Sequence, residues 1–104
     1  MQSLRAVEVA EEAGQLWGYC LYNFTYDTDR ALRILYVLDL LVDEAARGKG
    51  IGLSLMQTTE TIAREKSCSE LQWAVYAPNQ AALDFYHKFG GELIEDLLHM
   101  RKTL

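Results

Sequence analysis

The stretch Arg47-Gly48-Lys49-Gly50-Ile51-Gly52 separates an apolar run, residues 34–42, from a helix-like segment that begins at residue 51. Its three glycines allow sharp turns and let a ligand approach the main chain closely. The helix that follows offers N–H groups without intrahelical acceptors, together with the positive end of its dipole. The stretch therefore predicts a strand-to-helix turn that binds an anion, most often a phosphate.

Three strands are predicted before this loop. Residues 5–11 alternate, residues 16–26 are rich in aromatic side chains, and residues 31–42 become almost wholly apolar from residue 34 onward. Alternating and aromatic stretches suit a half-buried pleated surface, whereas a continuous apolar run is typical of a strand covered on both faces. Short turns at residues 13–14 and 27–30 would join the strands into an antiparallel meander, with the third strand in the centre of the sheet.

A helix and a fourth strand are predicted after the loop. Residues 51–66 read as a helix, and residues 71–75 alternate like a strand. A strand, loop, helix and strand in this order form a parallel crossover, which is normally right-handed. The stripe that we expect this helix to bury contains Ile51, Leu55, Thr58 and Ile62.

A second helix is predicted after residues 77–79, with Asn79 as its N-cap. Gly90-Gly91 stands where a helix C-terminus is expected, and residues 92–101 would form a last strand or hairpin. One face of this helix carries Ala82, Phe85, Tyr86 and Phe89.

The length of 104 residues fits one domain, residues 1–104. The net charge of −5 argues against a nucleic-acid partner. We expect no membrane partner, because no apolar run approaches the ~20 residues that span a bilayer and the N-terminus is neither a signal nor an anchor. Cys20 and Cys68 are interpreted as reduced, buried cysteines of a cytoplasmic protein. Neither His87 nor His99 has a second ligand at metal spacing, so no metal is expected.

Two common phosphate motifs do not fit the glycine loop. The chain contains no Gly-Lys-Ser/Thr tripeptide, and glycines spaced two apart do not match G-x-G-x-x-G. Arg47, Gly50 and Gly52 instead form R-x-x-G-x-G. This pattern resembles the pyrophosphate loop of the GNAT family of N-acetyltransferases. The alternative reading of the loop is a simple tight turn.

The pattern Asn79-x-x-Ala82-x-x-Phe85-Tyr86-x-x-x-Gly90 resembles a second signature of the same family. The resemblance implies acetyl-CoA as cofactor, a small-molecule primary amine as acceptor, and direct attack of the amine in a ternary complex. It gives the Tyr86 phenol the role of a hydrogen-bond or proton donor to the leaving thiolate. The alternative for Tyr86 is a core aromatic, because it shares its helix face with Phe85 and Phe89.

The diamine (spermidine/spermine-type) acetyltransferases are the branch that the sequence resembles most, through residues 18–19, 23–27 and 38–42. The resemblance implies that a bulge splays the central strand from its neighbour and opens a slot for the pantetheine arm. It also implies that Asn79 contacts this arm beside the sulfur. The main chain of Leu40, Leu41 and Val42 would pair with the arm, and the N–H groups of Arg47, Gly48, Lys49, Gly50, Ile51 and Gly52 would hold the pyrophosphate.

The sequence departs from that branch at the proton-accepting glutamate, whose position is Leu38. An alkyl ammonium has a pKa of about 10.4, so a proton must leave before attack. Either Asp39 takes the proton through a water molecule or bulk solvent takes it. In a regular strand Leu38 and Asp39 point to opposite faces, so Asp39 is no simple replacement. The alternative for Asp39 is a carboxylate that supports the loop.

The second departure is length, because the family normally begins with a strand and one or two helices that wall the acceptor pocket. We expect that fold without its usual N-terminal strand and helices, α/β (α+β) in class, with a mixed, mostly antiparallel central sheet flanked by helices. The wall is then missing or supplied by the second subunit of a homodimer. The competing function is a non-catalytic acyl-CoA-binding or interaction module derived from a truncated acetyltransferase.

Overall fold

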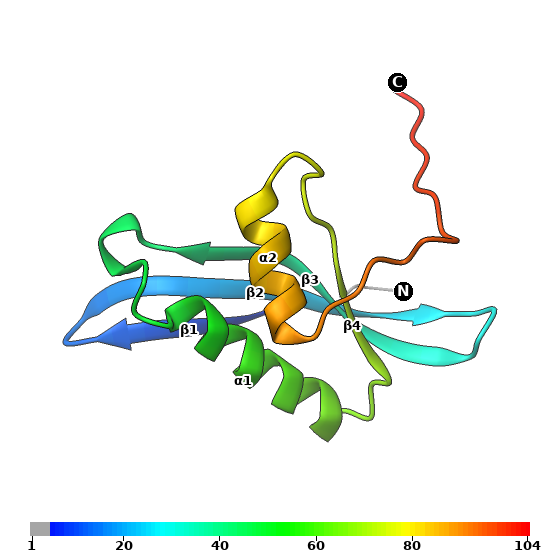
Figure 1. Ribbon diagram of the computed structural model, residues 1–104. Helices are drawn as coiled ribbons and strands as arrows, with labels where there is room; N and C mark the ends of the chain where they lie inside the picture. The colour runs from blue at the N-terminus through cyan, green and yellow to red at the C-terminus, as the bar shows by residue number, and fades with distance from the viewer. Residues whose placement is uncertain (1–4) are drawn as a thin grey trace. The chain divides into compact units, whose positions relative to one another are not determined.

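The computed structural model describes residues 5–104. The chain divides into two compact units, Met1–Ala74 and Val75–Leu104. The first unit contains a four-stranded sheet in the order β1-β2-β3-β4, and the second contains one helix (Figure 1). The elements are β1 (Arg5–Glu12), β2 (Gln15–Asp27), β3 (Leu32–Val42), the 3-10 helix η1 (Glu44–Ala46), α1 (Ile51–Glu65), β4 (Glu70–Trp73) and α2 (Gln80–Phe89).

The sheet is mixed and mostly antiparallel, as the sequence predicts. β1 pairs antiparallel with β2 and β2 with β3, whereas β3 pairs parallel with β4. The first hairpin turn has φ of 51° at Ala13 and 77° at Gly14, the positive pair that a two-residue turn with right-handed twist requires. In the second turn the Asp27 carboxylate accepts hydrogen bonds from the N–H groups of Asp29 and Arg30, both at 3.1 Å.

The core of the first unit lies between the sheet and α1, which crosses one face of the strands (Figure 1). Along β2, Gly18, Cys20 and Tyr22 are buried, so this alternate set faces the helix. Cys20 is fully buried as expected, whereas Cys68 is only partly buried. β3 is buried near its start and exposed near its end, so it is not covered on both faces throughout. The buried apolar side chains are Cys20, Tyr22, Ile34, Leu35, Val37, Ala46, Leu55, Met56 and Ala63.

The predicted buried stripe of α1 is wrong at Thr58, which is exposed. The helix instead buries Leu55, Met56, Thr59 and Ala63, a face centred one position later. Burial of Thr59 is tolerated because its hydroxyl donates to the Leu55 carbonyl at 2.8 Å.

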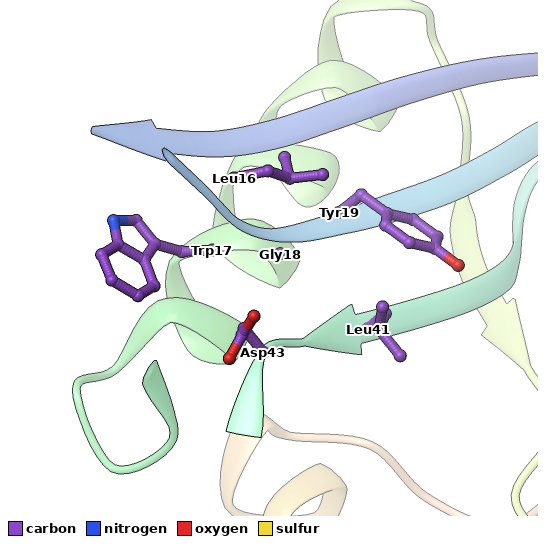
Figure 2. A pocket seen from close by; sticks show the side chains of 6 residues that line it. All are labelled: Leu16, Trp17, Gly18, Tyr19, Leu41 and Asp43. Atoms are coloured by element: carbon purple, nitrogen blue, oxygen red, sulfur yellow. The ribbon is translucent and has the colours of Figure 1, made fainter. Parts of the chain in front are cut away.

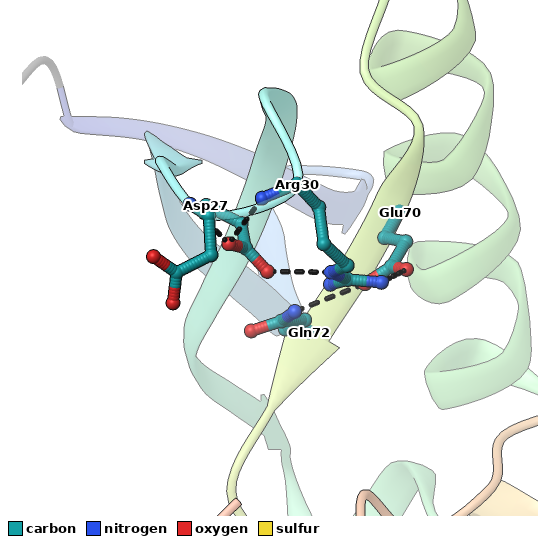
Figure 3. Close-up of polar contacts among 5 residues, drawn as sticks. Asp27, Arg30, Glu70 and Gln72 are labelled. Atoms are coloured by element: carbon teal, nitrogen blue, oxygen red, sulfur yellow. Dashed lines mark hydrogen bonds and ion pairs between the residues drawn. The ribbon is translucent and has the colours of Figure 1, made fainter.

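A polar cluster joins the β2–β3 turn to the start of β4 (Figure 3). The Arg30 guanidinium contacts the Asp27 carboxylate at 2.6 Å and the Glu70 carboxylate at 2.7 Å. Gln72 also donates to Glu70, at 3.0 Å. Arg30 is the main reason that the pKa values of Asp27 and Glu70 lie below their usual range. The cluster therefore fixes the position of β4 beside β3. Within it, the Asp27 carboxylate of the hairpin is paired with Arg30.

The second unit consists of α2 and the chain that follows it. Asn79 caps the helix, because its side-chain oxygen accepts from the Ala82 N–H at 3.0 Å. Gly90 ends the helix at φ 102°, and the Gly91 N–H donates to the Tyr86 carbonyl at 2.8 Å, a glycine-ended C-cap. The predicted strand or hairpin at residues 92–101 is wrong, since these residues form neither. Their apolar pairs, residues 93–94 and 97–98, do not alternate, so neither face of a strand could be buried as a unit.

Candidate functional site

β3 contains a bulge at Leu38. Leu21 of β2 pairs with Asp39 and Tyr22 pairs with Val37, which leaves Leu38 as the extra residue on β3. Two residues of a bulged strand oppose one residue of the partner, so Leu38 and Asp39 both lie opposite Leu21. Both side chains are exposed. The expectation that they point to opposite faces assumed a regular strand, and the bulge interrupts the strand at this position.

The end of β3 extends beyond β4. The ladder between these two strands runs from Ile34, paired with Glu70, to Val37, paired with Trp73. Leu40, Leu41 and Val42 pair with β2 but have no ladder partner in β4. An edge of this kind leaves main-chain N–H and C=O groups available to an extended ligand. The bulge and this open edge match the slot that the sequence resemblance implies.

The glycine loop follows the open edge directly. Gly48 and Gly50 have φ of 83° and 77°, and a Cβ built at either would meet no heavy atom within 4 Å. α1 begins at Ile51, and its first main-chain bond runs from the Ser54 N–H to the Gly50 carbonyl at 3.0 Å. The N-cap Gly50 supplies no side-chain hydrogen bond, so the N–H groups of the first turn of α1 are not capped from that position. The space and the donors both fit a phosphate group.

Gly18 allows β2 to approach the end of β3 closely. A Cβ at this position would lie 2.6 Å from the Leu41 carbonyl oxygen and 3.3 Å from Cδ1 of Leu55. Directly after the end of β3, the Asp43 N–H donates to the Trp17 carbonyl of β2 at 2.7 Å. Gly18 therefore sets the distance at which the open edge of β3 and the start of α1 are held against β2.

Asp39 has a partner that the sequence reasoning missed. The Tyr19 hydroxyl donates to Oδ2 of Asp39 at 2.9 Å. This hydrogen bond is the largest reason that the pKa of Tyr19 lies above its usual value, with burial and the negative charge of Asp39 adding to it. Predicting this contact would require the register between β2 and β3, because the bulge makes Tyr19 and Asp39 neighbours on one face.

Tyr19 also lines a shallow hollow of about 100 Å³ (Figure 2). Trp17, which lines it too, is 5.2 Å from Nζ of Lys49, measured to the ring centroid, so a cation–π contact links β2 to the glycine loop. The carboxylate in the lining is that of Asp43, which accepts from the Ala45 N–H at 2.8 Å. Its lining residues are Leu16, Trp17, Gly18, Tyr19, Leu41 and Asp43.

Asn79 and Tyr86 belong to the second unit. Asn79 lies at the start of α2, and Tyr86 lies within this helix. Their predicted places at the N-cap and along the helix are confirmed, but their contacts with a cofactor stay predictions. Tyr86 is partly buried, and its ring meets that of Phe85 edge-on with centroids 5.1 Å apart. The aromatic packing and the proposed role at the sulfur are compatible, because the hydroxyl is at the far end of the ring.

The residues that the structure describes hold no group of three potential ligands for a metal ion. His87 lies on α2 with Nδ1 3.2 Å from the Gly91 carbonyl oxygen. None of the described helices is long and apolar enough to cross a membrane.

The fold is a mixed α/β domain in which a glycine loop connects an open strand edge to the start of a helix. The sequence profile of the Acetyltransferase (GNAT) family matches residues 3–91. This chain belongs to the GNAT family of acetyltransferases. Enzymes of this family use acetyl-CoA as co-substrate.

Individual relatives support the same branch of the family. The chain is 37% identical over 75 residues to a thialysine N-epsilon-acetyltransferase of Bos taurus, covering 72% of this chain and 44% of that protein. It is 33% identical to the human spermidine/spermine N(1)-acetyltransferase-like protein 1, covering 70% of this chain and 10% of that protein. This similarity agrees with the resemblance to the diamine acetyltransferases in the sequence. The chain spans less than half the length of both.

A solved structure confirms the fold. An integron cassette protein from the mobile metagenome of V. cholerae superposes with a TM-score of 0.86 at 34% identity. The match covers 93% of this chain and 60% of that one. The expected mixed sheet of the GNAT type is therefore confirmed.

Proposed function

We propose that residues 1–104 form one acetyl-CoA-binding domain that transfers the acetyl group to a primary amine of a small molecule, of the diamine type. The observation that carries this proposal is the order of features along β3. The bulge at Leu38 is followed by the open edge of residues 40–42 and then by the glycine loop at the start of α1. An extended arm that ends in a pyrophosphate would fit this series of features.

The cofactor supplies an acetyl thioester when it is bound. The main chain of Leu40, Leu41 and Val42 would pair with its pantetheine arm, as a further strand pairs with a sheet edge. The N–H groups of the loop, residues 47–52, would hold the pyrophosphate, favoured by the helix dipole. Asn79 would contact the arm through its side-chain nitrogen, because its oxygen already accepts the helix-capping bond.

The amine would attack the thioester carbon directly and release a thiolate. Tyr86 would hydrogen-bond to the sulfur or protonate it as the bond breaks. The attacking amine must first lose a proton, and Leu38 cannot accept it. Asp39, acting through a water molecule, and bulk solvent are the two routes for that proton. The exposed face that carries Asp39 is the side from which we expect the acceptor to approach.

Thiol release from acetyl-CoA, measured with and without a panel of primary amines, tests the activity. We expect release that depends on an amine, and a lower kcat for Tyr86→Phe with an unchanged dissociation constant for CoA. Tyr26→Phe, an exposed tyrosine of β2, is the matched control. Equal kcat values for wild type and Tyr86→Phe would remove Tyr86 from the mechanism. Release without any amine would contradict direct transfer.

Calorimetric titration with CoA tests the loop separately. Gly50→Asp places a carboxylate where the pyrophosphate should lie, so we expect CoA affinity to be lost. Gly14→Asp has the same change of charge at a residue with almost the same φ, 77° at each, but at the far hairpin. Unchanged CoA affinity in Gly50→Asp would show that the phosphates bind elsewhere.

The non-catalytic acyl-CoA module is the second candidate, and the leucine at position 38 is the observation in its favour. It predicts CoA binding with no amine-dependent thiol release. We further propose that the protein works in the cytoplasm and as a homodimer. Sedimentation of the purified chain tests this assembly, and a monomer at all concentrations would contradict it.

A further inference from the structure

The Tyr19–Asp39 pair is a polar contact between side chains of β2 and β3 beside the bulge. Tyr19 pairs with Leu41 and Asp39 pairs with Leu21, so the two are diagonal neighbours across the ladder. Their side chains meet at 2.9 Å. Figure 2 shows the Tyr19 ring directed toward β3 beside Leu41. The bulge brings the carboxylate within reach of Tyr19, and the phenol fixes it there.

The direction of the hydrogen bond decides what the carboxylate can do. The phenol donates to Oδ2 of the carboxylate and so fixes the position of this negative charge. A carboxylate held against the reacting ammonium would moreover stabilise the protonated amine and oppose attack. Its charge is better used on a positive group of the acceptor that does not react.

The surroundings of the pair suit such a group. Asp39 is exposed, and only its Oδ2 takes part in the contact with Tyr19. Tyr19 also lines a hollow with an apolar wall of Leu16, Trp17 and Leu41, whose own carboxylate, Asp43, already accepts from the Ala45 N–H. An apolar wall beside a fixed carboxylate can accept a methylene chain that ends in an ammonium.

We propose that Tyr19 is a positioning residue that fixes Asp39 so that this carboxylate binds the non-reacting ammonium group of a diamine acceptor. This proposal rests on the proposed acetyltransferase function and deepens it. Tyr19 touches neither the acetyl group nor the attacking nitrogen. It acts through Asp39 alone, and the effect of its loss falls on acceptor binding rather than on the chemical step.

Nuclear magnetic resonance tests the pair without any catalysis. In protein labelled with carbon-13 in tyrosine and aspartate, 1,5-diaminopentane shifts the Tyr19 and Asp39 signals in a saturable way, and 1-aminopentane of equal chain length does so at least ~10-fold more weakly. Asp39→Asn abolishes the diamine response and lowers the pKa of Tyr19. Tyr26→Phe, on the same strand, leaves both unchanged. The absence of a saturable response to 1,5-diaminopentane in wild type overturns the proposal, whatever the acetylation assays give.

Steady-state kinetics then separate positioning from general structural damage. Tyr19→Phe keeps the ring, and we expect a KM for 1,5-diaminopentane raised by about 10-fold, with kcat within about 2-fold of wild type. The KM values for 1-aminopentane and for acetyl-CoA stay unchanged. An equal rise for both amines, or a fall in kcat alone, overturns the assignment. If wild type acetylates no amine, the proposed function fails, while the diamine titration still decides whether the pair binds the cation.

Discussion

Gly18 is the position where a single methyl group should disturb the proposed cofactor edge. A Cβ there would lie 2.6 Å from the Leu41 carbonyl oxygen, whereas ordinary contact begins at 3.4 Å. The obstacle is main chain, so no rotamer change relieves it. Either β3 retreats at Leu41 or β2 moves away from α1, where Leu55 is 3.3 Å from the same Cβ.

Gly18→Ala should lower the free energy of unfolding, whereas strand propensity alone would raise it. Replacing glycine by alanine within a strand usually stabilises by ~0.5–1 kcal/mol, because alanine loses less backbone entropy on folding. Inserting an atom into a close-packed site costs about 1–3 kcal/mol. For Gly18→Ala we therefore expect a net loss of roughly 1–2 kcal/mol, which lowers Tm by about 4–16 °C for a domain of this size. A displaced Leu41 also loses about one hydrogen bond to the pantetheine arm, weakening CoA binding by roughly 3–10-fold.

Urea unfolding and calorimetric titration with CoA measure the two effects. Gly14→Ala is the matched control, since a Cβ there meets nothing within 4 Å. Its positive φ of 77° costs about 1–2 kcal/mol by itself, but CoA affinity should stay at the wild-type value. If Gly18→Ala is as stable as wild type or more stable, the close approach of β2 and β3 is not as described. If it is less stable but binds CoA normally, Leu41 does not belong to the cofactor edge.

Three further predictions concern the frame around the site. Arg30 lowers the pKa of its two carboxylate partners, so its ion pairs stabilise the fold above about pH 4, and this stabilisation is lost as pH falls through the lowered pKa values. The urea midpoints of wild type and Arg30→Gln should therefore differ most near pH 7 and converge below pH ~3. A constant difference across that range would contradict this assignment. Thr59→Asp should lose several kcal/mol because it buries a charge, whereas Thr58→Asp should stay within ~0.5 kcal/mol in the same urea assay; equal losses would contradict the helix face described. Gly90→Ala should cost roughly 1–2 kcal/mol through its φ of 102° and reduce helical circular dichroism, and an unchanged spectrum would argue against the cap.

The elements that local chemistry specifies could be predicted from the sequence. Ala13-Gly14 supplies positive φ at a hairpin, Asn79 caps a helix and Gly90 ends one, and each is confirmed. The same is true of the glycine loop, whose position between an apolar strand and a helix follows from residues that are close in sequence. These features depend on the conformational range of one or two residues, so no knowledge of the partner strand was needed.

Features that depend on a partner strand or on the packing of a whole face could not be predicted in this way. The helical repeat does not distinguish Thr58 from its neighbour Thr59, so the sequence predicts the wrong threonine in the buried stripe of α1. Only packing against the sheet selects Thr59, whose hydroxyl has an acceptor one turn earlier. Residues 92–101 show the converse case, where apolar content favours a strand but no strand forms among these residues.

The bulge at Leu38 connects the fold to the chemistry. In a regular strand the missing glutamate and the remaining Asp39 would face opposite sides, and the carboxylate would be lost to the acceptor. The extra residue places Leu38 and Asp39 opposite Leu21 together, so the acceptor side keeps one negative charge at the neighbouring position. Tyr19 then fixes this carboxylate with a hydrogen bond of 2.9 Å. If Asp39 holds a cation of the acceptor, as we propose, the leucine at position 38 leaves deprotonation to solvent and leaves acceptor recognition to Asp39.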